Sequence, residues 1–340
     1  MREASDLDDI KASLATMGLR DEPLAIARLS GGVSCDVWRV DLASGPICVK
    51  RALTKLRVAA DWRAPAARSQ TEVAWLRFAA SVDAGCAPRV LGEDHERHIF
   101  AMEYFAPELY PVWKAELAAG AVNVDFAGKV GAALVRIHAA STGRADIAAA
   151  FANDAQFFAL RLEPFLLYSA DRNPDAAPRI RALAQGVATA RIALMQGDIS
   201  PKNILCGPGG PVFLDAETAC YGDPAFDLAF CLSHLLLKCV WRPQHTRAYL
   251  ESFDALRHAY FAGMTWEEPA AIDMRGAALL PALLLARVDG KSPPDYLTQE
   301  RDRTFVRDTA KTMLARQGLI LDEVRDLWRG ALHFAVASSR

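Results

Sequence analysis

The chain contains 340 residues, of which 52% are hydrophobic, and it carries a formal net charge of −2. This length allows one large domain or two moderate ones with an ample core. The near-neutral charge and the dispersed Lys and Arg residues indicate no nucleic-acid partner. The seven cysteines include no C-x-x-C pair, which disfavours a zinc site or a disulfide framework and fits a reducing cytoplasm best.

No stretch of the sequence is typical of a secreted or membrane-spanning chain. The N-terminal residues are polar and acidic, unlike those of a signal peptide. The most apolar run, residues 276–286, is too short to cross a bilayer and predicts a buried helix. We therefore expect a soluble cytoplasmic protein without a membrane partner, either a monomer or a homodimer.

The N-terminal third of the chain predicts one short helix followed by strands. Residues 5–18 have an amphipathic helical pattern that ends at a glycine. Period-2 alternation then predicts strands at residues 25–29, 36–42 and 47–50. The turn between the first two strands holds Gly31 and Gly32, whose backbone N–H groups could approach a phosphate closely. A plain hairpin turn is the alternative.

Lys50 ends the third strand among apolar neighbours. It either faces solvent at an edge or points under the glycine turn, where it would hold α- and β-phosphate oxygens. Such a lysine needs an orienting partner, and Glu72 in the helical pattern of residues 70–76 is the natural candidate. Strands follow at residues 89–92 and 98–104. Two prolines then break the pattern, which predicts a domain boundary at about 104–107.

Beyond this boundary the pattern is mostly helical. We expect helices over residues 125–139, 155–168, 178–194, 224–237 and 245–336, the last interrupted at Pro269, Pro281 and Pro293-Pro294. The position of His138 at a helix end favours packing or capping over catalysis. Asp227, at the head of its helix, is expected either to cap that helix or to brace the preceding polar loop from below.

That polar loop lies within residues 195–205. It carries Asp198 and, five residues later, Asn203, and it runs into an apolar segment. A glycine-rich turn connects this segment to a second one that ends at Asp215, so two paired strands would bring Asn203 and Asp215 to one edge. An amide oxygen and a carboxylate placed together suit Mg²⁺. Asp198 is then available to accept a proton from a hydroxyl group, which is a phosphoryl-transfer layout. An Asp in a turn, with an Asn that caps the next segment, is the alternative.

As an ordered set, the glycine pair, Lys50, Glu72, the Gly-Asp-x4-Asn loop and Asp215 resemble one family. This is the aminoglycoside phosphotransferase and choline kinase group, the small-molecule branch of the protein-kinase-like fold. The resemblance covers about residues 24–237. It implies an α+β, bilobal protein-kinase-like fold with ATP bound between the lobes. A small antiparallel-sheet N-lobe would span residues 1–104, and a larger, mostly helical C-lobe would span residues 105–340.

The resemblance also implies roles for individual residues. Asp198 would be the catalytic base, and Asn203 and Asp215 would hold Mg²⁺. Lys50, paired with Glu72, would contact the phosphates of ATP. The carbonyl of Glu103 and the amide of Phe105 would face adenine. The complete set implied for the nucleotide is Gly31, Gly32, Ser34, Lys50, Glu72, Glu103 and Phe105.

Three positions depart from the family pattern. Gln196 replaces the usual histidine, although its amide can still hydrogen-bond the loop backbone. Cys35 stands where relatives often carry a polar residue, which affects the contact of that loop with phosphate. Ser200 stands where protein kinases place a lysine, which points away from protein substrates.

Together these features predict an ATP-dependent phosphotransferase that acts on a hydroxyl group of a small molecule, such as an aminoglycoside, an amino alcohol or a sugar. A catalytically inactive nucleotide-binding regulatory module and a protein kinase are the alternatives. The break after residues 276–286 predicts Arg287 or Asp289 as a contact to the acceptor, with a solvated loop as the alternative. Acidic residues in this part of the chain favour an amine-bearing acceptor.

Overall fold

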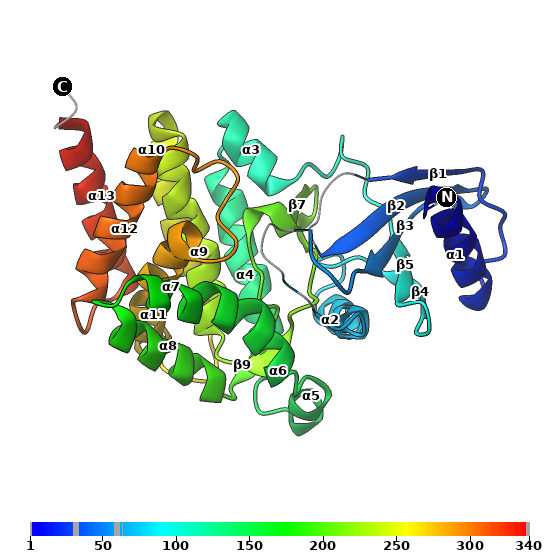
Figure 1. Cartoon of the computed structure of the whole chain (residues 1–340), viewed down its shortest axis with the longest axis horizontal. Helices are drawn as coiled ribbons and strands as arrows, with labels where there is room; N and C mark the ends of the chain where they lie inside the picture. Colours follow the sequence, from blue (N-terminus) through cyan, green and yellow to red (C-terminus); the bar gives the residue numbers. More distant parts are fainter. Residues whose placement is uncertain (1, 30–33, 58–61, 63, 338–340) are drawn as a thin grey trace.

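The computed structural model describes residues 2–29, 34–57, 62 and 64–337 of the chain. The expected phosphate-binding residues Gly31 and Gly32 lie outside the described residues. The fold is α+β, with an N-terminal antiparallel sheet on the right of Figure 1 and a mostly helical remainder on the left. This confirms the fold class predicted from the sequence.

The N-terminal sheet is antiparallel throughout, with the described strands in the order β1-β2-β3-β5-β4. Each strand pairs with its neighbour along the chain, apart from the exchange of β4 and β5, as short hairpin connections favour. The strands are β1 (Ala25–Arg28), β2 (Cys35–Leu42), β3 (Gly45–Ala52), β4 (Val90–Asp94) and β5 (Ile99–Glu103). The predicted strands are confirmed with small shifts at their ends.

The alternation of side chains divides this sheet into two buried faces. Val40 and Val49 face α1 (Arg2–Thr16), where they form a small apolar cluster with Ile10 of that helix. Cys48 belongs to the opposite cluster, which includes residues of α2 (Arg68–Val82) and continues into the helical part. Because side chains two positions apart share a face of a strand, Lys50 also points toward α2.

The helical part is built around long apolar helices. Helix α4 (Val124–Ser141) packs on α10 (Thr246–Ala262), and α9 (Ala225–Trp241) packs on both α10 and α11 (Pro269–Asp289). The remaining helices are α3 (Trp113–Ala119), α5 (Ala145–Ala150), α6 (Asp154–Phe157), α7 (Tyr168–Arg172), α8 (Ala177–Thr189), α12 (Glu300–Leu314) and α13 (Leu321–Ala337). Nearly every side chain of α9 is buried, so this helix forms the centre of the C-terminal core.

Two small antiparallel pairs of strands carry the polar loop. The predicted hairpin is confirmed as β7 (Ile204–Gly207) and β8 (Gly210–Phe213). The second pair is β6 (Ala193–Met195) with β9 (Cys220–Gly222). The prediction of a helix through residue 194 was therefore wrong at its end, because α8 stops at Thr189. The short run Ala193–Met195 is instead buried through pairing with β9, a strand far along the sequence.

Two further expectations about helices need correction. Pro281 does not interrupt its helix, because α11 runs through it and buries apolar residues on both sides. A proline removes one backbone hydrogen bond, and burial of this kind offsets that loss. Residues 155–168 are not a regular α-helix either. They contain a π-helix, Phe158–Leu167, with Pro164 inside it, and such wide turns occur often at functional sites.

By length and composition alone, α11 is the one described helix that could cross a membrane. Its most apolar window is 67% buried inside the structure. It packs against α9 and α12, and this position is typical of the core helix of a globular domain. The buried helix expected at residues 276–286 is thus part of a longer one.

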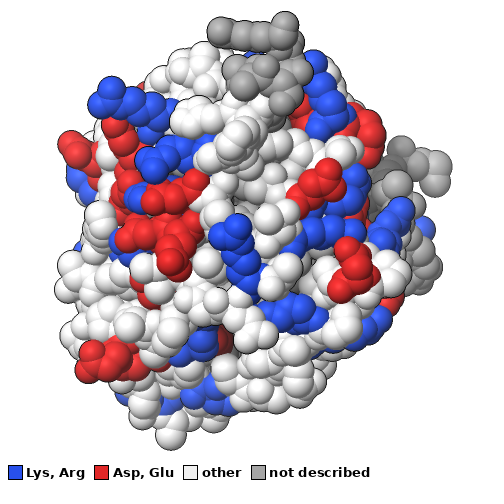
Figure 2. Space-filling model, turned by 90° about the vertical axis from the view of Figure 1, so that its left-hand side faces the viewer, with Lys and Arg blue, Asp and Glu red and all other residues white. Residues whose placement is uncertain are grey.

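The outer face of the helical part has mixed charge. Figure 2 views the side that lies at the left in Figure 1, where several acidic side chains gather on the left of the view and basic side chains are spread over the rest. Ion pairs within the last two helices, such as Arg307 with Glu300 and Arg325 with Asp322, are examples of this mixing. Ion pairs at such positions on the surface contribute little to stability. We therefore look for the charges that could select a ligand in the interior of the fold.

Candidate active site

Gly197 gives the polar loop its shape. Its φ of 80° lies in the left-handed region that favours glycine. A Cβ atom at this position would lie 2.7 Å from the Thr218 hydroxyl oxygen and 2.9 Å from the Thr218 carbonyl oxygen. The glycine therefore permits both the turn and the close contact with the segment after β8. We refer to residues 196–200 as the Asp198 loop.

A buried carboxylate on α9 holds this loop from behind. Asp227 accepts hydrogen bonds from the backbone N–H groups of Gln196, at 2.7 Å, and Gly197, at 2.8 Å. His138 lies 3.4 Å from the same carboxylate and 2.8 Å from the Tyr260 hydroxyl. Asp227 and His138 are both completely buried. Of the two roles considered for Asp227, bracing the loop is confirmed, and His138 packs beneath it.

The Gln196 side chain makes hydrogen bonds to two segments of the site. Its side-chain nitrogen donates to the carbonyl oxygens of Leu214, at 2.7 Å, and Asp215, at 3.2 Å. Its side-chain oxygen accepts from the backbone N–H of Asp198 at 2.6 Å. One amide therefore joins the Asp198 loop to the segment that ends at Asp215, as the sequence suggested that it could.

Asp198 is buried and held through one of its two carboxylate oxygens. Its Oδ2 accepts from the Asn203 side-chain nitrogen at 2.7 Å, and the Arg161 guanidinium and the Lys202 ammonium lie 3.0 and 3.2 Å from it. Its Oδ1 has no hydrogen bond to any described residue. The loop thus presents one fixed carboxylate oxygen with its lone pairs available.

Arg161 was not found by the sequence analysis. It lies in the π-helix, donates to the carbonyl oxygen of Gly197 at 2.5 Å and contacts Asp198 through a second nitrogen. Nothing in the local pattern marks Arg161, because its partners come 36 and 37 positions later and its orientation depends on an irregular helix. The hydrogen bond to Gly197 shows that Arg161 shapes the loop as well as holding the carboxylate.

The hairpin places Asn203 and Asp215 at the same edge, as predicted. Ile204 pairs with Phe213, and the backbone N–H of Leu214 donates to the carbonyl oxygen of Asn203 at 2.9 Å. The Asn203 nitrogen is used on Asp198, so its side-chain oxygen points away from that carboxylate. An amide oxygen beside a carboxylate is a donor set that fits a hard divalent cation such as Mg²⁺.

Lys50 lies between two carboxylates from different parts of the fold. Its ammonium is 2.7 Å from the Glu72 carboxylate of α2 and 2.6 Å from Asp215. Burial alone would lower the pKa of Lys50, but the charges of Asp215 and Glu72 outweigh it and hold that pKa well above its usual range. Burial raises the pKa of Glu72 to about 7, against the opposing effect of Lys50. For Asp215, the charges of Lys50 and Lys202 outweigh burial and lower the pKa to about 2.

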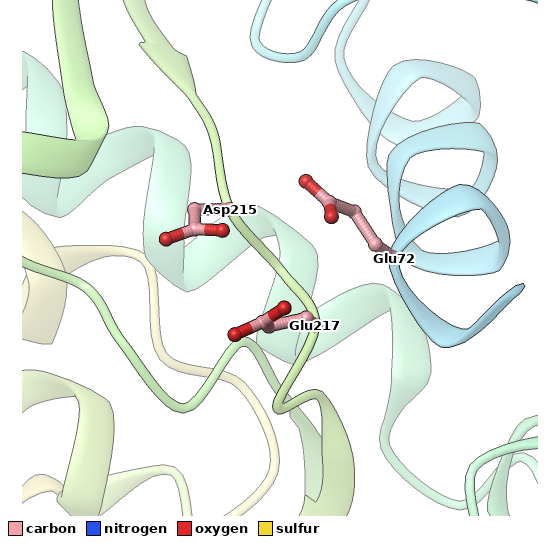
Figure 3. A group of neighbouring side chains, drawn as sticks. All are labelled: Glu72, Asp215 and Glu217. Atoms are coloured by element: carbon pink, nitrogen blue, oxygen red, sulfur yellow. The ribbon is translucent and has the colours of Figure 1, made fainter. Parts of the chain in front are cut away.

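A third carboxylate, Glu217, completes this group. Oxygen atoms of Glu72, Asp215 and Glu217 lie within 4.8 Å of one another. In Figure 3, Glu72 points from its helix toward the segment that carries the other two. Glu217 is 2.8 Å from the guanidinium of Arg68, which is completely buried at the start of α2. At the junction of the sheet and the helical part, three carboxylates therefore lie among two cations: Lys50 between Glu72 and Asp215, and Arg68 beside Glu217.

Arg68 also ties this group to the strand that follows the glycine turn. It donates to the carbonyl oxygens of Ser34, at 2.6 Å, and Leu53, at 2.7 Å. Neither Arg68 nor Glu217 was predicted from the sequence. The only available signals were an acidic residue two positions after Asp215 and a basic residue one helical turn before Glu72, and neither spacing is specific.

The residues expected near adenine lie at the connection between the two parts. Glu103 ends β5, and its backbone N–H donates to the Arg89 carbonyl oxygen at 2.9 Å. The Phe105 ring packs on Tyr110, with 4.6 Å between ring centroids. Glu103 is therefore the last residue of the sheet on this side, and Phe105 lies on the segment that connects the sheet to α3.

The two residues expected at the acceptor differ in their surroundings. Asp289 is engaged by Arg307, at 2.9 Å, and by the Asn173 side chain, at 3.0 Å. Arg287 is only 8% exposed and has no ion-pair partner among the described residues. Its guanidinium and that of Arg161 both approach the ring of Phe165, at 5.5 and 5.6 Å. Arg287 is therefore the one of the two on the side of Asp198.

Residues 25–261 match the sequence profile of the phosphotransferase enzyme family. The chain belongs to this family. Curated proteins give no match to it.

Solved structures are similar to this phosphotransferase at low identity. A choline/ethanolamine kinase family protein from Mesorhizobium loti is 18% identical, with a TM-score of 0.52 over 96% of this chain and 99% of the other. The choline kinase LicA from Streptococcus pneumoniae is 14% identical, with a TM-score of 0.48 over 91% and 99%. An aminoglycoside phosphotransferase from Alicyclobacillus acidocaldarius is 15% identical, with a TM-score of 0.48 over 94% and 95%.

Replacing Asp227 with alanine tests the bracing of the loop. The change would leave two buried backbone N–H groups without an acceptor, and we expect the free energy of unfolding to fall by on the order of 3 kcal/mol. Urea unfolding of the purified protein measures this loss. Asp308→Ala, at an exposed position on α12, is the matched control and should change little. A loss no larger than that of the control would show that Asp227 does not support the loop.

Proposed function

We propose that this phosphotransferase moves the γ-phosphate of ATP to a hydroxyl group of a small molecule. The observation that carries the proposal is the hydrogen bonding of the two carboxylate oxygens of Asp198. Three donors hold its Oδ2 while Oδ1 remains without a hydrogen bond to any described residue. A carboxylate oriented in this way is suited to accept the proton of an incoming hydroxyl as that oxygen attacks phosphorus.

The nucleotide would lie between the sheet and the helical part, in contact with residues from both. The Lys50 ammonium would exchange its contact with Asp215 for contacts with phosphate oxygens, while its ion pair with Glu72 keeps the side chain oriented. The backbone at Gly31, Gly32 and Ser34 would surround the phosphates, and Glu103 and Phe105 would receive adenine through a backbone carbonyl and a backbone amide. On this basis we divide the chain into an N-lobe, residues 1–104, and a C-lobe, residues 105–340.

Asn203 and Asp215 would hold Mg²⁺, which neutralises the charge on the transferring phosphate when it is bound. The orientation of the Asn203 amide supports this role, because its nitrogen is committed to Asp198 and its oxygen is not. Glu217 lies close enough to take part, although Arg68 is its partner in the structure.

An inactive nucleotide-binding module is the competing function, and no observation favours it. Such a module can dispense with the base or a metal ligand. Here all of these residues are present: Asp198 contacts Asn203, and Lys50 contacts both Glu72 and Asp215. The Asp198 loop is also fixed by Asp227, Gln196 and Arg161, and a chain that bound nucleotide without chemistry would not need this support.

Asp198→Asn tests the chemistry. The substitution keeps the shape of the side chain but removes its capacity to take a proton, so turnover should fall by about 10²–10⁴-fold. Nucleotide binding should remain nearly unchanged, because Asp198 is not proposed to contact ATP. Steady-state ADP formation and a nucleotide titration measure the two quantities. Turnover within about threefold of the wild type would exclude Asp198 as the base.

Asp215→Ala tests the metal site. If Asp215 holds Mg²⁺, its loss should weaken binding of Mg·ATP much more than binding of ATP in the presence of a chelator. Calorimetric titrations with and without Mg²⁺ give the comparison, and Asp198→Asn serves as the control because it should preserve the difference between the two forms of nucleotide. An equal loss for both forms would assign Asp215 a structural role through Lys50 instead.

A further inference from the structure

Two cationic side chains are buried in the helical part of the fold, on elements that follow Asp198 in the sequence, without a carboxylate partner in the described part of the chain. Lys238, on α9, is 1% exposed, and Arg287, near the end of α11, is 8% exposed. Neither has a carboxylate within ion-pair distance among the described residues. Their contacts are with aromatic rings, including Tyr296 and Trp241 for Lys238 and Phe165 for Arg287. We refer to Lys238 and Arg287 as the buried cation pair.

Several unsatisfied polar atoms belong to this pair, to its neighbours or to the Asp198 loop. The Nε atom of Arg287, Nε2 of His234, the hydroxyl of Tyr296 and the hydroxyl of Ser200 are all buried without a hydrogen-bond partner among the described residues. His234 lies one helical turn before Lys238 on α9, and Ser200 lies two residues after Asp198. Buried polar groups are nearly always paired, so such a group of unpaired ones indicates a place where a ligand supplies the missing partner.

Electrostatic effects connect Arg287 both to Asp198 and to Lys238. Burial lowers the pKa of Arg287, and the charge of Asp198 acts in the opposite direction. Burial also lowers the pKa of Lys238 to about 7, and the nearby cations Lys114 and Arg287 add to the effect while Asp295 opposes it. The cations are thus close enough to repel one another, and Arg287 is close enough to respond to the carboxylate that would meet the hydroxyl.

The aromatic rings do not form a site for a cationic ligand. Trp241 and Tyr296 stack with 4.4 Å between centroids, a surface that could otherwise attract an ammonium group. The Lys238 ammonium already occupies it, 3.8 Å from the centroid of Tyr296 and 4.6 Å from that of Trp241. A second cation would meet this charge and that of Arg287 in a poorly hydrated environment, where repulsion is strong.

We propose that the acceptor carries an oxyanion, a carboxylate or a phosphate, in addition to its hydroxyl group. The buried cation pair binds this oxyanion while the hydroxyl reaches Asp198. Burying an unpaired cation is costly, and a bound anion removes that cost. The inference rests on the proposed phosphotransfer and narrows its substrate class. It also replaces the expectation of an amine-bearing acceptor, which was based on acidic residues that the structure pairs with arginines, as Asp289 with Arg307.

The outer wall of this site is the segment between α11 and α12, residues 290–299. In Figure 1 this segment runs in front of α9. The Tyr296 ring of this segment has its centroid 3.8 Å from the Lys238 ammonium. Asp295 fixes the segment to α3 through Lys114, at 2.8 Å. Arg287, Lys238 and Tyr296 therefore come from three different elements, and Arg287 is the member of this group that responds to Asp198.

Binding of matched small hydroxyl compounds tests the proposal. The full chain is saturated with Mg·ADP to occupy the nucleotide site and is titrated calorimetrically with glycerol, glycerate, glycerol 3-phosphate and choline. We expect one or both anions to bind, and glycerol and choline to bind much more weakly. Glycerate and glycerol 3-phosphate distinguish a carboxylate site from a phosphate site. In Lys238→Met and Arg287→Met, anion affinity should fall by about 10–100-fold, the loss expected for a hydrogen bond to a charged group.

Lys291→Met is the matched control. Lys291 also carries a positive charge, lies just after α11 and pairs with Glu163, so its loss should leave anion binding unchanged. The proposal is overturned if choline binds more tightly than both anions, or if neither anion binds more tightly than about 10 mM. Unchanged anion affinity in both Lys238→Met and Arg287→Met would overturn it as well.

Turnover measurements with the same compounds separate this inference from the proposed function. If an anion binds through the buried cation pair but no compound stimulates ADP formation, phosphotransfer fails and the anion site stands. If choline stimulates ADP formation and the anions do not, phosphotransfer stands and the inference about the acceptor fails.

The stability of Lys238→Met provides an independent check without a ligand. The pKa of Lys238 is about 7 in the folded chain and near 10.4 in an unfolded one. The unfolded state therefore binds more protons between these values, so wild-type stability rises with pH across this interval and the cost of burial is complete below it. We expect Lys238→Met to raise the melting temperature most below about pH 7 and progressively less above it. Lys291→Met should show no such gain. A melting temperature of Lys238→Met that is unchanged or lower below about pH 7 would contradict a buried, unpaired cation.

Discussion

Asp227 accepts hydrogen bonds from the backbone N–H groups of Gln196 and Gly197, and the position of Asp198 depends on these two hydrogen bonds. The loop has little regular structure of its own, because Gly197 takes a left-handed conformation and Pro201 cannot donate a backbone hydrogen bond. Its rigidity comes instead from α9, whose apolar side chains are packed on all sides. The completely buried Asp227 carboxylate thus fixes the Asp198 loop, which presents the reactive group, to the well-packed helix α9.

A second set of contacts joins the sheet to this core. Lys50 is held between Glu72 and Asp215, and Arg68 lies between Glu217 and the carbonyl oxygens near the glycine turn. Both ion pairs involve α2, so the position of this helix determines whether Lys50 faces Asp215. The aromatic contact of Trp75 with Phe213, at 6.3 Å between centroids, fixes the same helix against the hairpin. The polar and apolar contacts therefore favour a single arrangement of α2.

The sequence predicted those parts of the site that depend on local pattern. The strand pattern ended at Lys50 and left an inward and a solvent-facing orientation open, and the glycine-rich turn specified the hairpin that brings Asn203 to the edge near Asp215. The remaining parts depend on contacts between distant residues. Arg68 meets Glu217 across 149 positions, and Arg161 reaches Asp198 from an irregular helix whose geometry no periodic pattern indicates. The wrong extension of α8 through residue 194 has the same origin, because β6 is a strand only through its pairing with β9.

The distribution of charge around Asp198 would orient the acceptor in the proposed reaction. Glu72, Asp215 and Glu217 gather on the side of the sheet, where a divalent cation and Lys50 would balance them against phosphates. On the opposite side of Asp198, the buried Lys238 and Arg287 lack any carboxylate partner among the described residues. An acceptor with a hydroxyl at one end and an oxyanion at the other would be repelled from the acidic side and attracted to the basic one. It would then enter with its hydroxyl toward Asp198, so the same charges that select the molecule would also orient it.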